Sequence, residues 1–331
     1  MFTLWITANC NLNCKYCYEG ENKLNKSMTK DIIDKSIKFG LDNFMDKDEE
    51  LRVAIHGGEP FLEFENIKYI IKEIKEKAKK IDKKPRFLTT TNGTILNDEI
   101  MEFIVKEMPD ITLSIDGTKE THDKTRKFKN GKGSHSIVLE NGLKLLKQLP
   151  NMRIRMTFDS ETVKNLYEDV KYLIDYGFKI IVPVPNLFDS NWNESHVEIL
   201  KQQIKSIKKY IVCKKDVAVS IADKNIYKLK RYCNGGKSSI HIYSDGNLYP
   251  CTLVGGKKEF CIGNIYDGVD IKKRDELLNI SKEKNIDCDG CSLYNYCDGP
   301  RCKIKNKILT GDYNQASPMG CAMENLLYEL N

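Results

Sequence analysis

The first 17 residues, MFTLWITANCNLNCKYC, place three closely spaced cysteines directly behind a short β-prone run. Residues 2–7 combine aromatic and β-branched side chains, which favours a strand. Cys10, Cys14 and Cys17 follow with C-x3-C-x2-C spacing, in what we expect to be the loop after that strand. Iron–sulfur clusters are held by thiolates, usually four. Three cysteines therefore predict a cluster with one iron open to a bound molecule, as at a catalytic metal site.

Beyond this loop, strand-like and helix-like segments alternate along the chain. The predicted strands cover residues 2–7, 51–56, 86–91, 111–115, 152–158 and 179–184, and the predicted helices cover residues 29–44, 64–81, 98–107, 137–149, 166–176 and 197–212. Such alternation predicts a parallel sheet with helical crossovers. Its periodicity leaves both a partial barrel and a doubly wound sheet open.

The composition excludes several classes of protein. The 331 residues carry a formal net charge of +6, but mixed-sign runs such as residues 72–77 suit a solvated helix face better than a nucleic-acid surface. No stretch reaches the about 18 apolar residues of a membrane span, and the N-terminus lacks the basic region of a secretory signal. We therefore expect a cytoplasmic protein with no nucleic-acid or membrane partner. In that reducing compartment, its 12 cysteines should bind metal or do chemistry rather than form disulfides.

The cysteine triplet resembles the signature of the radical S-adenosylmethionine (SAM) superfamily, including the aromatic residue before the third cysteine, Tyr16. The resemblance implies a 4Fe–4S cluster on Cys10, Cys14 and Cys17, with SAM on the open iron. It also implies that SAM is cleaved to a 5′-deoxyadenosyl radical, which abstracts hydrogen from the substrate. The residues alone leave one alternative, a zinc site that lacks its fourth ligand, and the absence of a histidine within the next few residues argues against it.

The segment His56-Gly57-Gly58-Glu59-Pro60 follows the second predicted strand. Glycines at a strand end let the backbone approach a ligand closely. In the superfamily this segment binds the amino group of SAM, which assigns Gly57, Gly58 and Glu59 to the cofactor. Without the resemblance, the segment could be an ordinary strand-to-helix turn. His56 is predicted to be a packing residue.

Similar segments end later strands, namely Thr91-Asn92-Gly93-Thr94 and Ser114-Ile115-Asp116-Gly117. The full set of further SAM contacts that the resemblance implies is Tyr16, Thr91, Asn92, Ser114, Asp116, Arg126 and Val184. Arg126 is the candidate for the SAM carboxylate because a guanidinium suits a carboxylate, with Arg153 and Arg155 as competitors. Asp116 could instead form a turn.

The last third of the chain is rich in glycine and cysteine. A hairpin is predicted over residues 239–250, with Ser244-Asp245-Gly246-Asn247 as its turn. The cysteines read Cys233-x12-Gly246-x4-Cys251, then Cys288-x2-Cys291-x5-Cys297-x4-Cys302, then Cys321. This pattern resembles the SPASM domain of peptide and protein maturases. It departs only before Cys302, where the family has three intervening residues and this chain has four, Pro300 among them.

The second resemblance implies two auxiliary 4Fe–4S clusters. Cys288, Cys291, Cys297 and Cys321 would ligate the distal cluster, and Cys233, Cys251 and Cys302 the nearer one. Some family members have a further cysteine where this chain has Tyr227, so the nearer cluster could have an open iron unless Cys213 or Cys261 fills it. Either cysteine could equally be a small buried apolar residue. A zinc ribbon over residues 288–302 has compatible spacing but leaves the other cysteines unexplained.

We therefore expect an α/β protein with a partial (β/α)6 TIM-like barrel in residues 1–214 and a small Cys-rich iron–sulfur SPASM domain in residues 215–331. The leading functional hypothesis is a maturase that forms a thioether in a ribosomally made precursor peptide, because an open auxiliary iron would suit a substrate thiolate. The alternatives are carbon–carbon or carbon–oxygen crosslinking, epimerisation, formylglycine formation and non-catalytic electron transfer. Thr252 argues against formylglycine formation, because sulfatase-maturating enzymes have an aspartate base there.

The expected partners follow from the resemblance. A flavodoxin- or ferredoxin-type protein would supply electrons, and the precursor peptide would be the substrate. Since the first predicted strand begins at Phe2, we expect no N-terminal leader-binding domain. A leader would then be bound by a separate protein, by the catalytic domain, or not at all.

Overall fold

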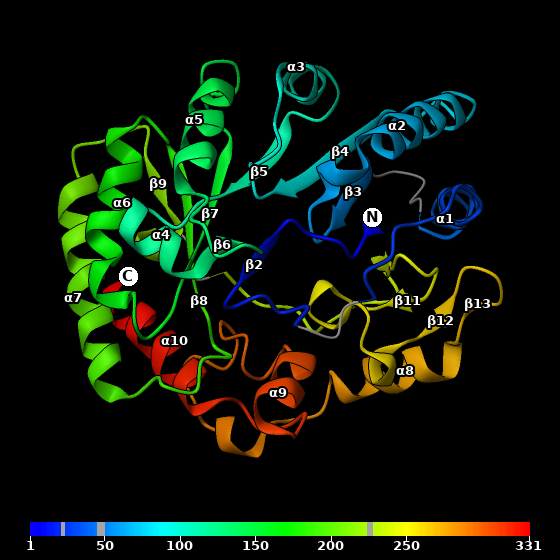
Figure 1. Cartoon of the computed structure of the whole chain (residues 1–331). Helices are drawn as coiled ribbons and strands as arrows, with labels where there is room; N and C mark the ends of the chain where they lie inside the picture. The colour runs from blue at the N-terminus through cyan, green and yellow to red at the C-terminus, as the bar shows by residue number, and fades with distance from the viewer. Residues whose placement is uncertain (21–23, 45–49, 224–227) are drawn as a thin grey trace. The chain divides into compact units, whose positions relative to one another are not determined.

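The computed structural model describes residues 1–20, 24–44, 50–223 and 228–331. They form two compact units, coloured along the chain in Figure 1. The first unit contains Met1–Asn13, Cys17–Thr112 and Asn234–Leu278, and the second contains Cys14–Tyr16, Leu113–Cys233 and Asn279–Asn331. Tyr227 lies outside the described residues. In the described part of the chain, no helix is both long and apolar enough to cross a membrane.

The first unit is built on parallel strands. Its strands are β1 (Phe2–Thr7), β3 (Leu51–Gly57), β4 (Pro85–Thr91), β10 (Ile240–Ile242), β11 (Leu248–Tyr249), β12 (Gly263–Asn264) and β13 (Gly268–Val269). Its helices are α1 (Lys30–Asn43), α2 (Phe64–Lys79), α3 (Asp98–Glu107), most of α8 (Ile271–Ile280), and the short 3-10 helices at Pro60–Glu63, Thr252–Val254 and Lys258–Phe260. The strands β2 (Leu12–Cys14) and β5 (Asp110–Ser114) contribute residues to both units.

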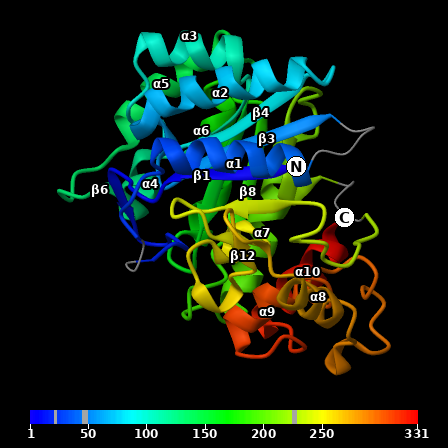
Figure 2. The ribbon, with the colours of Figure 1, turned by 90° about the vertical axis from the view of Figure 1, so that its right-hand side faces the viewer.

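The strand β1 lies at the centre of the first unit and is buried along its whole length. It pairs in parallel with β3 on one side and with β10 on the other. The helices α1 and α2 run along these strands in Figure 2. Each helix has apolar residues three or four positions apart, such as Ile33 and Ile37 in α1, so one face is buried against the sheet.

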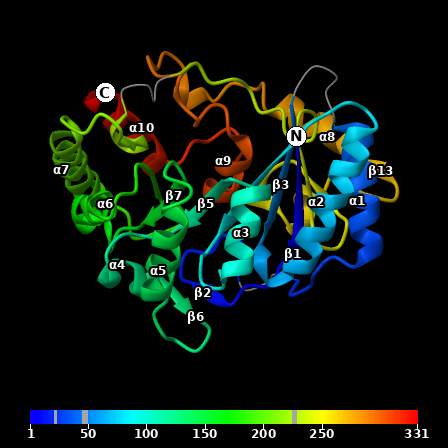
Figure 3. The same ribbon diagram turned by 90° about the horizontal axis from the view of Figure 1, so that it is seen from above.

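The second unit repeats the strand–helix alternation. Its elements are α4 (Lys119–Thr125), β6 (Arg126–Phe128), α5 (His135–Leu146), β7 (Arg153–Phe158), α6 (Leu166–Asp175), β8 (Ile180–Pro185), α7 (Glu194–Ile211), β9 (Ala218–Val219), α9 (Lys303–Thr310), α10 (Pro318–Leu330), and the short 3-10 helices at Val163–Asn165, Ser220–Ala222 and Ile286–Cys288. The strands β7, β8 and β9 pair in parallel. The helix α10 lies beside α7 (Figure 3). Lys201 of α7 pairs with Glu329 of α10 at 2.6 Å.

The predicted α/β class is confirmed. The strands follow the order β11-β10-β1-β3-β4-β5 in the first unit and β5-β7-β8-β9 in the second. Among the strands that alternate with helices, β1-β3-β4-β5 and β5-β7-β8-β9, the order along the sheet is the order along the chain, without a reversal. A doubly wound sheet reverses its strand order at a switch point, so this order favours the partial barrel. The predicted division between residues 214 and 215 stays a prediction.

The predicted hairpin is also confirmed. In it, Ile242 pairs with Leu248, and Tyr243 N donates to Asn247 O at 2.8 Å to close the turn. The sequence did not indicate that β10 would pair in parallel with β1 and so extend the sheet of the first unit.

Candidate active site

The loop that carries the cysteine triplet is held at its start by the backbone of Gly57 and Gly58. Gly58 N donates to Thr7 O at 3.1 Å, and Glu59 N donates to Asn9 O at 2.9 Å. A Cβ atom would lie 2.3 Å from Thr7 O if added at Gly57, and 2.4 Å from Asn9 O if added at Gly58. Neither distance is tolerable, so both positions require glycine. In this structure, the two glycines let the backbone come close to another segment of the same chain, residues 7–9.

Glu59 is fully buried where β3 ends. Its Oε1 accepts hydrogen bonds from Phe61 N at 3.1 Å and Thr91 Oγ1 at 2.9 Å, and its Oε2 accepts from Asn92 N at 2.7 Å. Hydrogen bonds from neutral donors favour the ionised carboxylate. The ends of β3 and β4 therefore hold a buried carboxylate in one orientation.

Asn92 connects the end of β4 to the first cysteine. Its Nδ2 donates to Asn11 Oδ1 at 2.9 Å and to Cys10 Sγ at 3.7 Å, while Asn11 Nδ2 donates to Thr94 Oγ1 at 2.7 Å. Leu12 N also donates to Cys10 Sγ, at 3.4 Å. Hydrogen bonds to cysteine sulfur are one of the means by which proteins set the potential of an iron–sulfur cluster. The surroundings of Cys10 therefore fit a cluster thiolate.

His56 is half-buried beside this loop, and its ring centroid lies 4.6 Å from that of Trp5. Its Nε2 shares a hydrogen bond with Tyr18 Oη at 3.0 Å. Burial lowers the pKa of His56 to about 4, so the ring is neutral at neutral pH. These contacts agree with the packing role that the sequence predicts.

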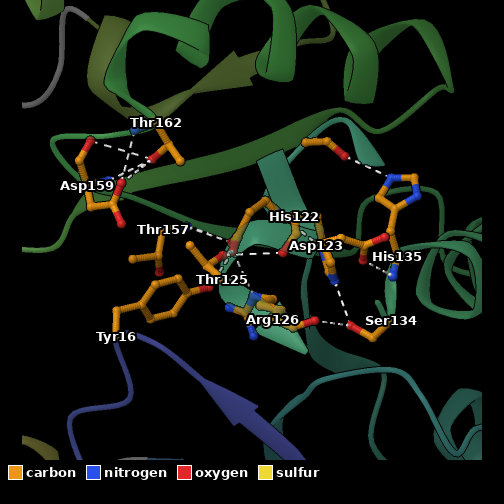
Figure 4. A network of polar contacts seen from close by, with 12 residues as sticks. Tyr16, His122, Asp123, Thr125, Arg126, Ser134, His135, Thr157, Asp159 and Thr162 are labelled. Carbon is orange, nitrogen blue, oxygen red and sulfur yellow. Dashed lines mark hydrogen bonds and ion pairs between the residues drawn. The ribbon is translucent and has the colours of Figure 1, made fainter. Parts of the chain in front are cut away.

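In the second unit, a fully buried aspartate, Asp116, accepts hydrogen bonds from four donors. The residues that supply them, Tyr16, Thr125, Arg126 and Thr157, are labelled in Figure 4. Asp116 Oδ2 accepts from Tyr16 Oη, from Arg126 Nε at 3.0 Å and from Thr125 Oγ1 at 3.2 Å. Its Oδ1 accepts from Thr157 N at 2.9 Å. Both oxygens are thus bound to the protein itself, which makes Asp116 more than the turn former considered from the sequence.

The guanidinium of Arg126 is buried, and it lies 5.3 Å from the centroid of the Tyr16 ring. Although burial opposes the charge, Asp116 holds the pKa of Arg126 above its usual range. Within the described residues, Nη1 and Nη2 of Arg126 have no acceptor. The two terminal nitrogens are the pair that binds a carboxylate in a fork-like geometry.

The competing arginines, Arg153 and Arg155, lie on a different strand from Arg126, namely β7. Arg153 and Arg155 are exposed, while Ile154 and Met156 between and after them are buried. Because side chains alternate across a strand, the two arginines point away from the core. Arg126 is therefore the stronger candidate for binding an anion.

A chain of hydrogen bonds holds the backbone of Arg126 against Asp116. Asp116 N donates to His122 Nδ1 at 3.3 Å, His122 Nε2 contacts Ser134 Oγ at 2.9 Å, and Ser134 Oγ donates to Arg126 O at 2.7 Å. This arrangement requires a neutral His122 ring with its proton on Nε2. Burial supplies that state, because it lowers the pKa of His122 to about 3.

Sequence reasoning missed Asp169, which supports the same turn. Its Oδ1 accepts from Thr118 N at 2.8 Å and from Thr118 Oγ1 at 2.7 Å. A Cβ on Gly117 would lie 2.2 Å from Asp169 Cβ, and the φ angle of Gly117 is +101°. Glycine is thus required for the turn. Of the other predicted contacts, Ser114 is buried at the end of β5, and Val184 is half-buried near the end of β8.

Four of the C-terminal cysteines line one mostly apolar cavity in the second unit. The cavity is lined by Cys288, Cys291, Cys297 and Cys321 together with Leu187, Leu293, Tyr294, Pro300, Leu309 and Ala316, among others. Gly299 N donates to Cys297 Sγ at 3.2 Å, and Asn325 Nδ2 donates to Cys321 Sγ at 3.4 Å. These four are the residues assigned to the distal cluster, and their surroundings fit one.

The cysteines that line this cavity do not form a site for a single metal ion. Across the described ranges, no three His, Cys, Asp or Glu residues are placed to hold a single metal ion. A 4Fe–4S cluster, by contrast, is held by four separate thiolates.

The remaining cysteines lie in different surroundings. Burial raises the pKa of the Cys302 thiol, and the nearby Cys233 raises it further. Cys251 and Cys261 belong to the first unit, where Cys261 Sγ donates to Gly263 O at 3.2 Å. Cys213 is exposed beside the end of α7, so it is not the small buried residue considered from the sequence.

Known proteins resemble the chain along most of its length. The sequence profile of the Radical SAM superfamily matches residues 6–185. An uncharacterized protein of Methanocaldococcus jannaschii is 30% identical over 274 residues, which cover 81% of this chain and 90% of that protein. A cysteine-type anaerobic sulfatase-maturating enzyme of Clostridium novyi is 27% identical over 332 residues, covering 88% and 84%.

Among solved structures, native anSMEcpe with bound AdoMet and Cp18Cys peptide matches with a TM-score of 0.80 and 20% identity. The match covers 99% of this chain and 96% of that one. It shows that the two chains share a fold.

Replacing Gly58 with alanine should disturb the cysteine loop, because the new Cβ would meet Asn9 O at 2.4 Å. We expect the anaerobically reconstituted variant to lose about four irons, the content of one 4Fe–4S cluster. Iron analysis and electron paramagnetic resonance after reduction measure this. Gly131→Ala is the control for backbone strain alone: its φ of +81° disfavours a side chain, but nothing lies within 4 Å of the added Cβ, so this variant should keep its iron. An unchanged iron content in Gly58→Ala would contradict the role given to this contact.

The buried neutral His122 should make the protein sensitive to acid. Its pKa falls from 6.5 to about 3 on folding, so the unfolded state binds more protons between these values. The contribution of the neutral His122 to stability is complete well above pH 6.5 and is lost as the pH falls through 6.5 toward 3. Between about pH 8 and about pH 5, His122 should account for a loss of about 2 kcal/mol. Denaturant unfolding at both pH values measures it, and His122→Asn should lose less stability than the wild type. An equal loss in both proteins would refute the assignment.

Proposed function

Because the chain belongs to the radical SAM superfamily, we propose that it is a peptide maturase that forms a thioether between a cysteine sulfur and a carbon atom. The observation that carries this proposal is the joint presence of a held cysteine loop, a fixed buried carboxylate at Glu59 and a distal set of four cysteines around one cavity. The first two features serve SAM, and the third serves an auxiliary cluster.

The residues on the strand ends would bind SAM. Glu59 presents a buried carboxylate, which suits the amino group of SAM. Arg126 presents two terminal nitrogens without a protein acceptor among the described residues, which suit the carboxylate of SAM. When bound, SAM and a 4Fe–4S cluster on Cys10, Cys14 and Cys17 supply a 5′-deoxyadenosyl radical that abstracts hydrogen. Asp116 is then a positioning residue, since it orients Arg126 and Tyr16 rather than the cofactor.

Two comparisons support a peptide substrate. The relative from Clostridium novyi matures sulfatases, and the matching anSMEcpe structure contains a peptide as well as AdoMet. We propose that this chain likewise acts on a cysteine-containing peptide, with electrons from a flavodoxin- or ferredoxin-type donor. A separate leader-binding protein remains part of the proposal.

The auxiliary cysteines favour a thioether as the product. An open iron on a cluster held by Cys233, Cys251 and Cys302 would bind a substrate thiolate. Thioether formation removes one hydrogen atom from the carbon, one proton from the thiol and one electron, which an auxiliary iron–sulfur cluster would accept. The product therefore weighs two hydrogens less than the substrate.

Formylglycine formation is the second candidate, because the sulfatase-maturating relative matches 88% of this chain. That reaction converts a cysteine into an aldehyde and replaces sulfur with oxygen. Thr252 stands where the resemblance places the aspartate base of those enzymes. The two products differ in mass, so one experiment distinguishes them.

The test is to reconstitute the protein anaerobically, reduce it, and incubate it with SAM and cysteine-containing peptides. We expect about twelve irons per chain, 5′-deoxyadenosine, and a peptide that has lost two hydrogens and its free thiol. An aldehyde product that has lost sulfur would favour the formylglycine alternative. Failure to cleave SAM under any reducing condition would refute the proposal as a whole.

Changes at Arg126 should weaken SAM binding more than they slow the bound enzyme. Arg126→Lys keeps the charge but loses the fork, so KM for SAM should rise about tenfold to a hundredfold, since hydrogen bonds to charged groups contribute about 1.5–3 kcal/mol. Asp116→Asn should act in the same direction by releasing Arg126. Arg153→Lys is the matched control at an exposed arginine. Production of 5′-deoxyadenosine against SAM concentration measures the effect, and an equal response in Arg153→Lys would contradict it.

A further inference from the structure

The cysteine spacing departs from the expected pattern between Cys297 and Cys302, where there are four residues instead of three. The last of the four is Arg301. Arg301 is only 7% exposed, although it is charged. Its guanidinium lies close to two aromatic rings, 4.7 Å from the centroid of Tyr232 and 4.5 Å from that of Tyr294. Cation–π contacts of this kind stabilise a buried guanidinium.

Arg301 also joins two segments that carry cysteines. Its Nε donates to Lys230 O at 3.3 Å, and its Nη2 donates to Asn295 Oδ1 at 3.3 Å. Lys230 N in turn donates to Asn295 O at 2.9 Å. Cys233 lies three residues after Lys230, and Cys302 directly follows Arg301, so this side chain connects the two segments that carry these cysteines.

The charge of Arg301 lacks a partner in the described part of the chain. No carboxylate there forms an ion pair with it, and its Nη1 atom is buried without any hydrogen-bond acceptor. A buried cation with an unsatisfied donor is costly, and the two rings offset only part of that cost. An anionic group close to this position would balance the charge.

We propose that Arg301 is a positioning residue of the nearer auxiliary cluster, where it holds Cys233 beside Cys302 and balances the negative charge of the thiolate-bound iron. The inference rests on the proposed auxiliary clusters. Net charge and surroundings set the potential of an iron–sulfur cluster, and a nearby cation favours the reduced, more negative form. Arg301 therefore raises the midpoint potential of that cluster.

The test compares wild type, Arg301→Gln, Arg301→Lys and the control Lys230→Gln after anaerobic reconstitution. Lys230→Gln keeps the backbone carbonyl that Arg301 uses and removes only a half-exposed charge that pairs with Asp298 at 3.3 Å. Iron and sulfide content and a potentiometric titration followed by electron paramagnetic resonance are measured for each protein.

We expect Arg301→Gln to shift one auxiliary midpoint to a more negative potential, or to lose the iron of one cluster, with the other clusters unchanged. Arg301→Lys should restore most of the wild-type value, and Lys230→Gln should match the wild type. Unchanged iron and potentials in Arg301→Gln would overturn the proposal. Loss of iron from every cluster in both Arg301 variants would also overturn it, by showing a general structural role. Wild-type protein with only about four irons would instead refute the auxiliary clusters of the proposed function, and this role with them.

Discussion

The close contact between the backbone at residues 57–58 and the carbonyl oxygens of Thr7 and Asn9 determines how the first half of the site is built. No side chain fits between these segments, so geometry alone requires the two glycines. The contact places Glu59 at the end of β3, and from there hydrogen bonds extend through the end of β4 to Cys10. The close backbone contact at residues 57–58 thus positions three segments that are distant in sequence: the loop of Cys10, the end of β3 and the end of β4.

The second unit depends on how buried charge is neutralised. Asp116 and Arg126 form an ion pair away from water, where breaking one partner leaves the other uncompensated. The surrounding groups are therefore constrained in their protonation: Tyr16 must donate, and His122 must stay neutral to accept. Burial enforces both states, because it raises the pKa of the tyrosine and lowers that of the histidine. Asp116, for which the sequence also allowed a role as a turn former, is therefore the acceptor at the centre of a buried network of charged and hydrogen-bonded groups.

Sequence patterns predicted the long elements well and the tertiary contacts poorly. The six strand–helix pairs were predictable because each has the periodicity of a half-buried helix or a buried strand. The helix α4 and the strand β6, with seven and three residues, are too short to show a period. The bond between Tyr16 and Asp116 joins residues 100 positions apart, which leaves no local signal. The sequence showed only one extra residue before Cys302 and did not single out Arg301, whose ring contacts are visible only in the structure.

The parallel pairing of Phe2 with Ile240 has a consequence for biosynthesis. The strand β1 can pair with β3 soon after both have been translated, but its other edge must wait for β10, because Ile240 lies 238 positions after Phe2. At about 5–20 residues per second, this delay lasts roughly 10–50 s. An unpaired apolar edge is a template for pairing with other chains. Nascent chains of this protein should therefore depend on chaperones during that interval, and slower or crowded expression should favour aggregation over native folding.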